Sequence, residues 1–298
     1  MQYQLLGKST LRVSEITFGC MSLGNDDTGN AQLIHHAIEK GINCFDTADL
    51  YNQGQNEITV GKALKGKRQD VVIATKVGNQ WREDGSGWDW NPTKKYILAS
   101  VEESLQRLQT DYIDLYQLHG GTINDPIDDT IAAFETLQQQ GKIRYYGISS
   151  IRPDVIRTYV QRANIVSVMM QYSLLDRRPE ETCFSLLAEN GIGVLARGPV
   201  AKGLLVSKPP VAYLNYNPEE VATAAAAVQR LSVTGRDAAQ TALRFVLQQP
   251  AVTTAVVGMR TMQQLEDAIG AVQAPALTAA DLQQLQAALP INKYEQHL

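Results

Sequence analysis

The sequence predicts an α/β protein with a (β/α)8 barrel fold, and three observations lead to this prediction. Eight short apolar runs alternate with longer helical patterns along the 298 residues, which is typical of a parallel sheet. Most of these runs show no alternation of apolar and polar residues, as expected for strands buried on both faces. A count of eight favours a closed TIM barrel over a doubly wound sheet, and no break in composition divides the chain. We therefore expect one barrel domain over residues 1–298.

The predicted strands are short, and a helical pattern follows each of them. They cover Glu15–Phe18, Asn43–Asp46, Val71–Lys76, Ile113–Leu118, Ile143–Ile148, Ser167–Gln171, Gly193–Ala196 and Thr254–Val257. Four helical patterns have clear boundaries, because proline favours the first turn of a helix and glycine favours the position after its end. These patterns cover residues 30–40, 92–108, 126–141 and 179–191.

Several segments lie outside the eightfold repeat. A short N-terminal hairpin, Tyr3–Leu6 with Leu11–Val13, is expected to plug the bottom of the barrel. Insertions at Gly78–Asn91 and Gly198–Asn217 follow strands, so a barrel would place both on its catalytic face. An extra amphipathic helix is predicted at Thr278–Leu289, near the C-terminus.

Composition narrows the class of protein. A net charge of −4 with 19% charged residues excludes a general polyanion-binding surface, so no nucleic-acid partner is expected. The three cysteines, Cys20, Cys44 and Cys183, form no CxxC pair, and their odd number argues against a disulfide framework. No apolar run suits a signal peptide or a membrane span, so we expect a cytoplasmic protein with no membrane partner. Because no long exposed apolar face stands out, we also expect a monomer.

Four polar residues lie at the carboxyl ends of three successive predicted strands. Asp46 ends the second strand, Tyr51 follows it, Lys76 ends the third, and His119 follows the fourth. A barrel would bring all four to one mouth, the face on which barrel enzymes carry their active sites. Each residue alone has an ordinary interpretation, as a turn cap, a loop aromatic, a surface lysine or a core histidine. The four together indicate a catalytic site.

These residue types suit the protonation of a carbonyl oxygen while a hydride reaches the carbon. A tyrosine has a pKa of about 10, and a nearby ammonium lowers it by stabilising the phenolate. A carboxylate keeps the lysine charged and oriented, and a histidine can hydrogen-bond the substrate oxygen or the tyrosine hydroxyl. The helical neighbours His35 and His36 point in different directions and cannot share a metal, so no metal site is predicted.

The same residues lie in segments that resemble the three catalytic motifs of the aldo-keto reductase superfamily. The segments are Phe45-Asp46-Thr47-Ala48-Asp49-Leu50-Tyr51, Ala74-Thr75-Lys76 and Leu115-Tyr116-Gln117-Leu118-His119. The resemblance covers essentially the whole chain. It implies a bacterial-type, NADPH-dependent oxidoreductase on a (β/α)8 barrel, with Asp46, Tyr51, Lys76 and His119 as its catalytic residues. The expected reaction reduces aldehydes or ketones to alcohols, with Tyr51 as the proton donor.

The resemblance also implies where NADPH or NADP+ binds. The nicotinamide end falls on Met21, Asp46, Ser149, Gln171 and Arg197. The pyrophosphate falls on a loop that contains Gly198, Lys202 and Leu204, and the adenosine 2′-phosphate falls on Gly258, Arg260, Gln264 and Asp267. A helix start with an arginine suits a phosphate, so Arg260 favours NADPH over NADH.

Three positions depart from the family pattern. Ser150 stands where asparagine is usual, Arg197 stands where an aromatic residue often stacks on the nicotinamide, and Ala268 replaces a frequent asparagine. The contacts to the carboxamide and to the adenine are therefore expected to differ. A cation beside an oxidised nicotinamide is unfavourable, so Arg197 predicts a bias toward NADPH over NADP+.

The substrate and two other functions stay open. Trp81, Trp88 and Trp90 either line a pocket for apolar or aromatic carbonyl compounds or pack the insertion against the barrel rim. The barrel could bind NADPH as a sensor or regulatory subunit with little turnover. An unrelated barrel could use Lys76 as a Schiff-base amine, although that chemistry needs a lowered lysine pKa and Asp46 would raise it.

Overall fold

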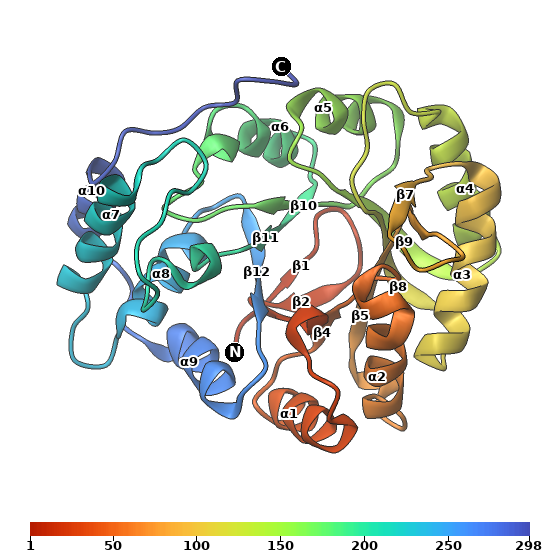
Figure 1. Ribbon diagram of the computed structural model, residues 1–298, viewed down its shortest axis with the longest axis horizontal. Coiled ribbons are helices and arrows are strands. Elements are labelled where there is room, and N and C mark those ends of the chain that lie inside the picture. The colour runs from red at the N-terminus through yellow and green to blue at the C-terminus, as the bar shows by residue number, and fades with distance from the viewer.

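The computed structural model describes residues 1–298 and contains the predicted closed barrel of parallel strands, surrounded by helices (Figure 1). The strands around the barrel are β3 (Ile16–Gly19), β4 (Cys44–Asp46), β5 (Val72–Val77), β8 (Ile113–Leu118), β9 (Ile143–Ser149), β10 (Ser167–Gln171), β11 (Gly193–Arg197) and β12 (Val252–Gly258). Strand β12 pairs in parallel with β3 and closes the ring. All eight predicted strands are confirmed, with small shifts at their ends.

The helices form the outer layer. They are α1 (Asp27–Glu39), α2 (Gln55–Ala63), α3 (Lys94–Leu108), α4 (Ile127–Gln139), α5 (Pro153–Arg162), α6 (Cys183–Glu189), α7 (Pro218–Arg230), α8 (Ala238–Leu247), α9 (Met262–Gln273) and α10 (Ala279–Ala287). The main core lies between the strands and these helices, where Phe18, Phe45 and Tyr116 are fully buried. No helix combines the length and the apolar character that a membrane crossing requires.

Three predicted helices begin two or more residues from the expected position, and one of them, α3, begins at Lys94 rather than at Pro92 because the side chain of Thr93 caps it. Helix α1 starts at Asp27 rather than at Asn30, because the side chain of Asp26 caps its N-terminus. The predicted helix over residues 179–191 is shorter, since a 3-10 turn occupies its first residues and α6 begins at Cys183.

The two insertions differ in structure. The Gly78–Asn91 insertion contains two strands that were not predicted, β6 (Asn79–Trp81) and β7 (Trp88–Trp90), which pair as an antiparallel hairpin. The Gly198–Asn217 insertion is a loop with one 3-10 turn at Ala201–Gly203. Both follow the carboxyl ends of barrel strands, as predicted.

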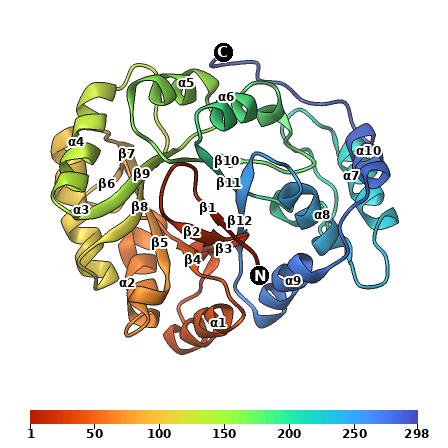
Figure 2. The ribbon, with the colours of Figure 1, turned by 180° about the vertical axis from the view of Figure 1, so that it is seen from behind.

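The N-terminal hairpin closes the opposite end of the barrel. Its strands β1 (Tyr3–Leu5) and β2 (Arg12–Ser14) pair in antiparallel fashion, and the hairpin lies over the centre of the barrel in Figure 2. Leu6, Leu11 and Val13 are almost fully buried against strand residues that point into the barrel. The hairpin therefore supplies the apolar filling of the barrel bottom.

A glycine lets the hairpin approach the strands closely. Gly7 has a φ of +55°, and a Cβ atom there would lie 2.3 Å from the carbonyl oxygen of Val166. No other residue fits this turn without moving the backbone. Because Val166 directly precedes β10, the contact places the plug at the amino ends of the strands, opposite the catalytic mouth.

Shortening a buried side chain of the N-terminal hairpin should destabilise the whole barrel. We expect Leu6→Ala to lower the free energy of unfolding by about 2–5 kcal/mol, because the lost methyl groups leave a cavity among buried side chains. Urea unfolding followed by circular dichroism measures this change. Leu5→Ala is the matched control, since Leu5 is 55% exposed on the same hairpin. A Leu6→Ala variant as stable as the Leu5→Ala variant would contradict the plug.

Candidate active site

The four residues expected to be catalytic come together at the carboxyl ends of β4, β5 and β8, which are hydrogen-bonded neighbours in the barrel. Asp46 is the last residue of β4, and Tyr51 begins the turn that follows it. Lys76 lies near the end of β5, and His119 directly follows β8. The structure thus places all four at one mouth, as the sequence predicted.

The ammonium group of Lys76 is the centre of this cluster. Its Nζ donates hydrogen bonds to Asp46 Oδ2 at 2.8 Å, to the carbonyl oxygen of Thr47 at 2.7 Å and to the hydroxyl oxygen of Tyr51 at 3.2 Å. An ammonium group has three donors, so each one is satisfied. Lys76 is only 1% exposed and Asp46 only 4% exposed, and the ion pair is therefore shielded from water.

Asp46 keeps the buried lysine charged. Burial alone would lower the pKa of Lys76, but the charge of Asp46 and the hydrogen bonds to Asp46 and Tyr51 outweigh burial and raise this pKa above its ordinary value. A Schiff-base lysine must be a free amine at neutral pH, so this geometry argues against that alternative.

Tyr51 lies on a strained turn that other segments support. The turn carries left-handed backbone at Asn52 (φ 49°) and Gln53 (φ 54°), which is unfavourable for residues other than glycine. Trp81, from the β6–β7 hairpin, donates from Nε1 to the carbonyl oxygen of Leu50 at 3.1 Å. The hairpin therefore holds the residue before Tyr51 in place.

His119 faces Tyr51 and is uncharged. The two rings meet edge to face, with their centroids 5.7 Å apart. Burial, and then the positive charges of Lys76 and Arg197, lower the pKa of His119 from 6.5 to about 3. Its Nδ1 is buried and has no hydrogen-bond partner in the protein. The same is true of Asp46 Oδ1. A buried polar atom without a partner suggests a group that accepts a ligand.

Asn56, which was not predicted from the sequence, connects three parts of the site. Asn56 Oδ1 accepts a hydrogen bond from Thr47 Oγ1 at 2.6 Å, and its Nδ2 donates to the carbonyl oxygen of Cys20 at 2.8 Å. It thus joins helix α2 to the ends of β3 and β4. An asparagine on the buried face of a predicted helix was the signal that could have identified it.

The residues expected at the nicotinamide end occupy the next strands around the barrel. Ser149, Gln171 and Arg197 are the last residues of β9, β10 and β11. Gln171 and Arg197 are paired in register, and Arg197 Nη1 donates to Gln171 Oε1 at 3.0 Å. Ser150, in place of the usual asparagine, is buried, and its Oγ accepts from the N–H of Arg152. Its hydroxyl oxygen is therefore engaged in the local turn.

The expected pyrophosphate loop has an unusual backbone. Gly198 and Lys202 both have positive φ angles, of 70° and 58°. Lys202 is exposed, whereas the side chain of Leu204 is buried in the core. Leu204 can therefore contribute only its backbone to a ligand.

The expected adenosine segment lies at the end of β12 and the start of α9. Gly258 ends β12 and is exposed, and Arg260 precedes the helix with an exposed side chain. The backbone N–H of Arg260 donates a hydrogen bond to Gln264 Oε1 at 3.0 Å. Asp267 Oδ1 accepts a hydrogen bond from Gln263, one turn earlier in the helix. The guanidinium group of Arg260 forms no hydrogen bond or ion pair with the chain and is therefore free to bind an anion.

The three tryptophans differ in position. Trp90 Nε1 donates to the carboxylate of Asp125 at 3.0 Å and packs on the core, and Trp81 is tied to the Tyr51 turn. Trp88 is 47% exposed, and Met21, which follows β3, is 67% exposed. Trp81 and Trp90 therefore favour the interpretation that the insertion packs against the barrel rim.

The neutral state of His119 predicts a loss of stability in acid. The unfolded chain binds a proton with a pKa near 6.5, and the folded chain does so only near 3, so stability falls as the pH falls through this range. When the pH falls from neutral to about 5, we expect the free energy of unfolding of His119→Asn to fall by about 2 kcal/mol less than that of wild type. Urea unfolding at both pH values tests this difference, with His297→Asn as an exposed control. An equal fall in the free energy of unfolding of His119→Asn and wild type between the two pH values would refute a buried neutral imidazole.

Comparison with known proteins agrees with this geometry. The model of the aldo/keto reductase family matches residues 15–290. The holo form of aldo-keto reductase AKR11C1 from Bacillus halodurans is 53% identical and superposes with a TM-score of 0.94, covering 100% of this chain and 99% of that one.

Two further relatives match this chain over nearly its whole length. The uncharacterized oxidoreductase YqkF of Bacillus subtilis is 49% identical over 310 residues, covering 100% of this chain and 99% of the relative. The glycerol dehydrogenase AKR11B4 from Gluconobacter oxydans is 26% identical, with a TM-score of 0.86 over 99% of each chain. Aldo-keto reductases generally use a nicotinamide cofactor. The chain belongs to the aldo/keto reductase family.

Proposed function

We propose that this oxidoreductase reduces aldehydes or ketones to alcohols with NADPH, and that Tyr51 donates the proton. The observation that carries the proposal is the hydrogen bond from Lys76 Nζ to the hydroxyl oxygen of Tyr51. Because Lys76 donates to this oxygen, the O–H bond of Tyr51 is free to point toward a substrate oxygen. The buried positive charge also stabilises the phenolate that remains after the proton leaves.

His119 completes the proton-donor site. Its ring is neutral at physiological pH, so it can hydrogen-bond a carbonyl oxygen without placing a second positive charge beside Lys76. Nδ1 is enclosed by the protein, so such a contact would come from Nε2, the ring nitrogen that is not buried and makes no hydrogen bond to the chain. Asp46 acts through Lys76, which it keeps charged and directed at Tyr51.

Cationic residues at the carboxyl ends of β11 and β12 suit a nucleotide with several phosphates. Arg197 ends β11, Lys202 lies in the loop after it and Arg260 follows β12, all on the same face as Tyr51, and none of the three forms an ion pair with a carboxylate of the chain. In this proposal Ser149, Gln171 and Arg197 hold the nicotinamide end, with Met21 and Asp46 beside it. Gly198, Lys202 and Leu204 hold the pyrophosphate, and Gly258, Arg260, Gln264 and Asp267 hold the adenosine end. When bound, NADPH supplies the hydride.

The proton donor can be tested directly. We expect Tyr51→Phe to lower the rate of NADPH oxidation with aromatic aldehydes by about 10²–10⁴-fold, because general acid catalysis is lost. NADPH affinity, measured by quenching of tryptophan fluorescence, should stay within about twofold, since the ring remains. Tyr3→Phe, on the N-terminal hairpin, is the matched control.

The outcomes separate three readings of the site. Oxidation that persists in Tyr51→Phe would exclude Tyr51 as the donor. NADPH binding to wild type without any oxidation would favour a sensor or regulatory subunit. An absence of NADPH binding would overturn the cofactor assignment.

The preference for NADPH over NADH should depend on Arg260. We expect Arg260→Ala to weaken NADPH binding by about 10–100-fold and to leave NADH binding nearly unchanged, because only NADPH carries the 2′-phosphate. Titration of each cofactor measures the ratio. Arg230→Ala is the control, since Arg230 is an exposed arginine at the end of α7. An equal loss for both cofactors would place Arg260 elsewhere than at the 2′-phosphate.

A further inference from the structure

The side-chain amide of Gln171 is held in one orientation, because hydrogen-bond acceptors contact its Nε2 and a donor contacts its Oε1. Gln171 Nε2 donates to Asp176 Oδ2 at 2.9 Å and to the hydroxyl oxygen of Tyr213 at 2.9 Å. Gln171 Oε1 accepts from Arg197 Nη1 at 3.0 Å. A carboxylate only accepts and a guanidinium only donates, so both ends of the amide require the same orientation.

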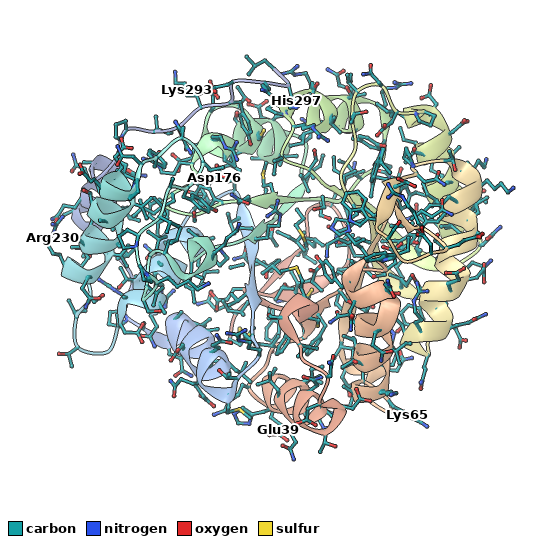
Figure 3. All side chains as sticks on the ribbon, viewed as in Figure 1. Glu39, Lys65, Asp176, Arg230, Lys293 and His297 are labelled. Atoms are coloured by element: carbon teal, nitrogen blue, oxygen red, sulfur yellow. The ribbon has the colours of Figure 1, made fainter.

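Asp176 is a rigid acceptor for this amide. It is fully buried, and its two oxygens accept hydrogen bonds from Arg178 Nε and Nη2 at 2.8 Å each. Its backbone pairs with Ser173 in a short bridge. Figure 3 shows Asp176 within the molecule, in contrast to Glu39 and Arg230 at the periphery. The carboxylate is thus fixed before any ligand arrives.

Tyr213 comes from the loop expected to cover the pyrophosphate. Residues 207–212 of this loop are all exposed, and the chain returns to the barrel at Tyr213, which is half-buried. Tyr213 and Tyr216 pair through their backbones, which shapes the returning turn. The hydroxyl group of Tyr213 therefore links the far half of the loop to the end of β10 through the hydrogen bond from Gln171.

We propose that Tyr213 is a positioning residue for the cofactor, which fastens the loop of residues 198–217 to the amide of Gln171 and fixes that amide for the nicotinamide carboxamide. This proposal rests on the assignment of Gln171 to the cofactor site in the proposed function. Both N–H groups of Gln171 are already used by Asp176 and Tyr213. Gln171 can therefore meet a carboxamide only as an acceptor, through the remaining lone pair of Oε1.

The link joins two parts of one binding site. The nicotinamide end is held by rigid strand ends, whereas the pyrophosphate is held by a loop with a long exposed stretch. Loss of the Tyr213 hydroxyl group removes the hydrogen bond between the loop and Gln171 and leaves one N–H of the amide without a partner. Cofactor release then becomes faster, because loops that close over a ligand control its escape.

The test compares Tyr213→Phe with Tyr216→Phe. Each variant loses one hydroxyl group from the same turn, but the Tyr216 hydroxyl donates to the carbonyl oxygen of Pro290, away from Gln171. We expect Tyr213→Phe to release NADPH about two- to tenfold faster in stopped-flow fluorescence, as the loss of one hydrogen bond predicts. Tyr216→Phe should release NADPH at the wild-type rate. In a Gln171→Ala background, Tyr213→Phe should have no further effect.

A second measurement needs no cofactor. Proteinase K should cut within residues 207–212 faster in ligand-free Tyr213→Phe than in ligand-free Tyr216→Phe or wild type, because the fastening is lost. Equal release rates and equal cleavage in the two variants, or an undiminished effect in the Gln171→Ala background, would overturn the proposal. If wild type binds no NADPH, the proposed function and the role of Tyr213 toward the cofactor both fail, and cleavage alone decides whether Tyr213 fastens the loop.

Discussion

The buried ion pair between Lys76 and Asp46 is the constraint around which the site is built. A buried ammonium group is unfavourable unless each of its three N–H donors finds an acceptor at close range. The barrel supplies three acceptors within 3.2 Å of Lys76 Nζ, which are the carboxylate of Asp46, the backbone carbonyl of Thr47 and the hydroxyl oxygen of Tyr51. The same positive charge adds to burial in lowering the pKa of His119, and it donates a hydrogen bond to the oxygen of Tyr51. Displacement of Lys76 would therefore alter every other member of the site.

The mouth divides into a rigid half and a looser half. The ends of strands β4, β5 and β8 carry the residues proposed for proton transfer, and buried contacts such as those of Asn56 support them. The carboxyl ends of β9 to β12 carry the residues proposed for the cofactor, which include exposed cations on connecting segments. Chemistry requires fixed atoms, whereas cofactor exchange requires a segment that opens. The hydrogen bond between Tyr213 and Gln171 connects the loop to the end of a barrel strand, where these two requirements meet.

Much of the fold was predictable because barrel strands have a local signature. Runs such as Ile113–Leu118 and Ser167–Gln171 are bounded as predicted, since strands buried on both faces need continuous apolar residues. The hairpin at Asn79–Trp81 and Trp88–Trp90 was missed, because each of its strands is only three residues long and partly exposed. The start of α6 was also misplaced, because Pro179 belongs to a separate turn.

The sequence by itself determined the repeat of strands and helices and the residues at the strand ends, including Asp46, Lys76 and His119. These follow from local order, because consecutive parallel strands bring their carboxyl ends to one side. Only the tertiary structure decided that Gln171 meets Tyr213, 42 residues away, and that Asn56 joins Thr47 to Cys20. Such contacts depend on how loops and helices pack, and no periodic pattern along the chain records that packing.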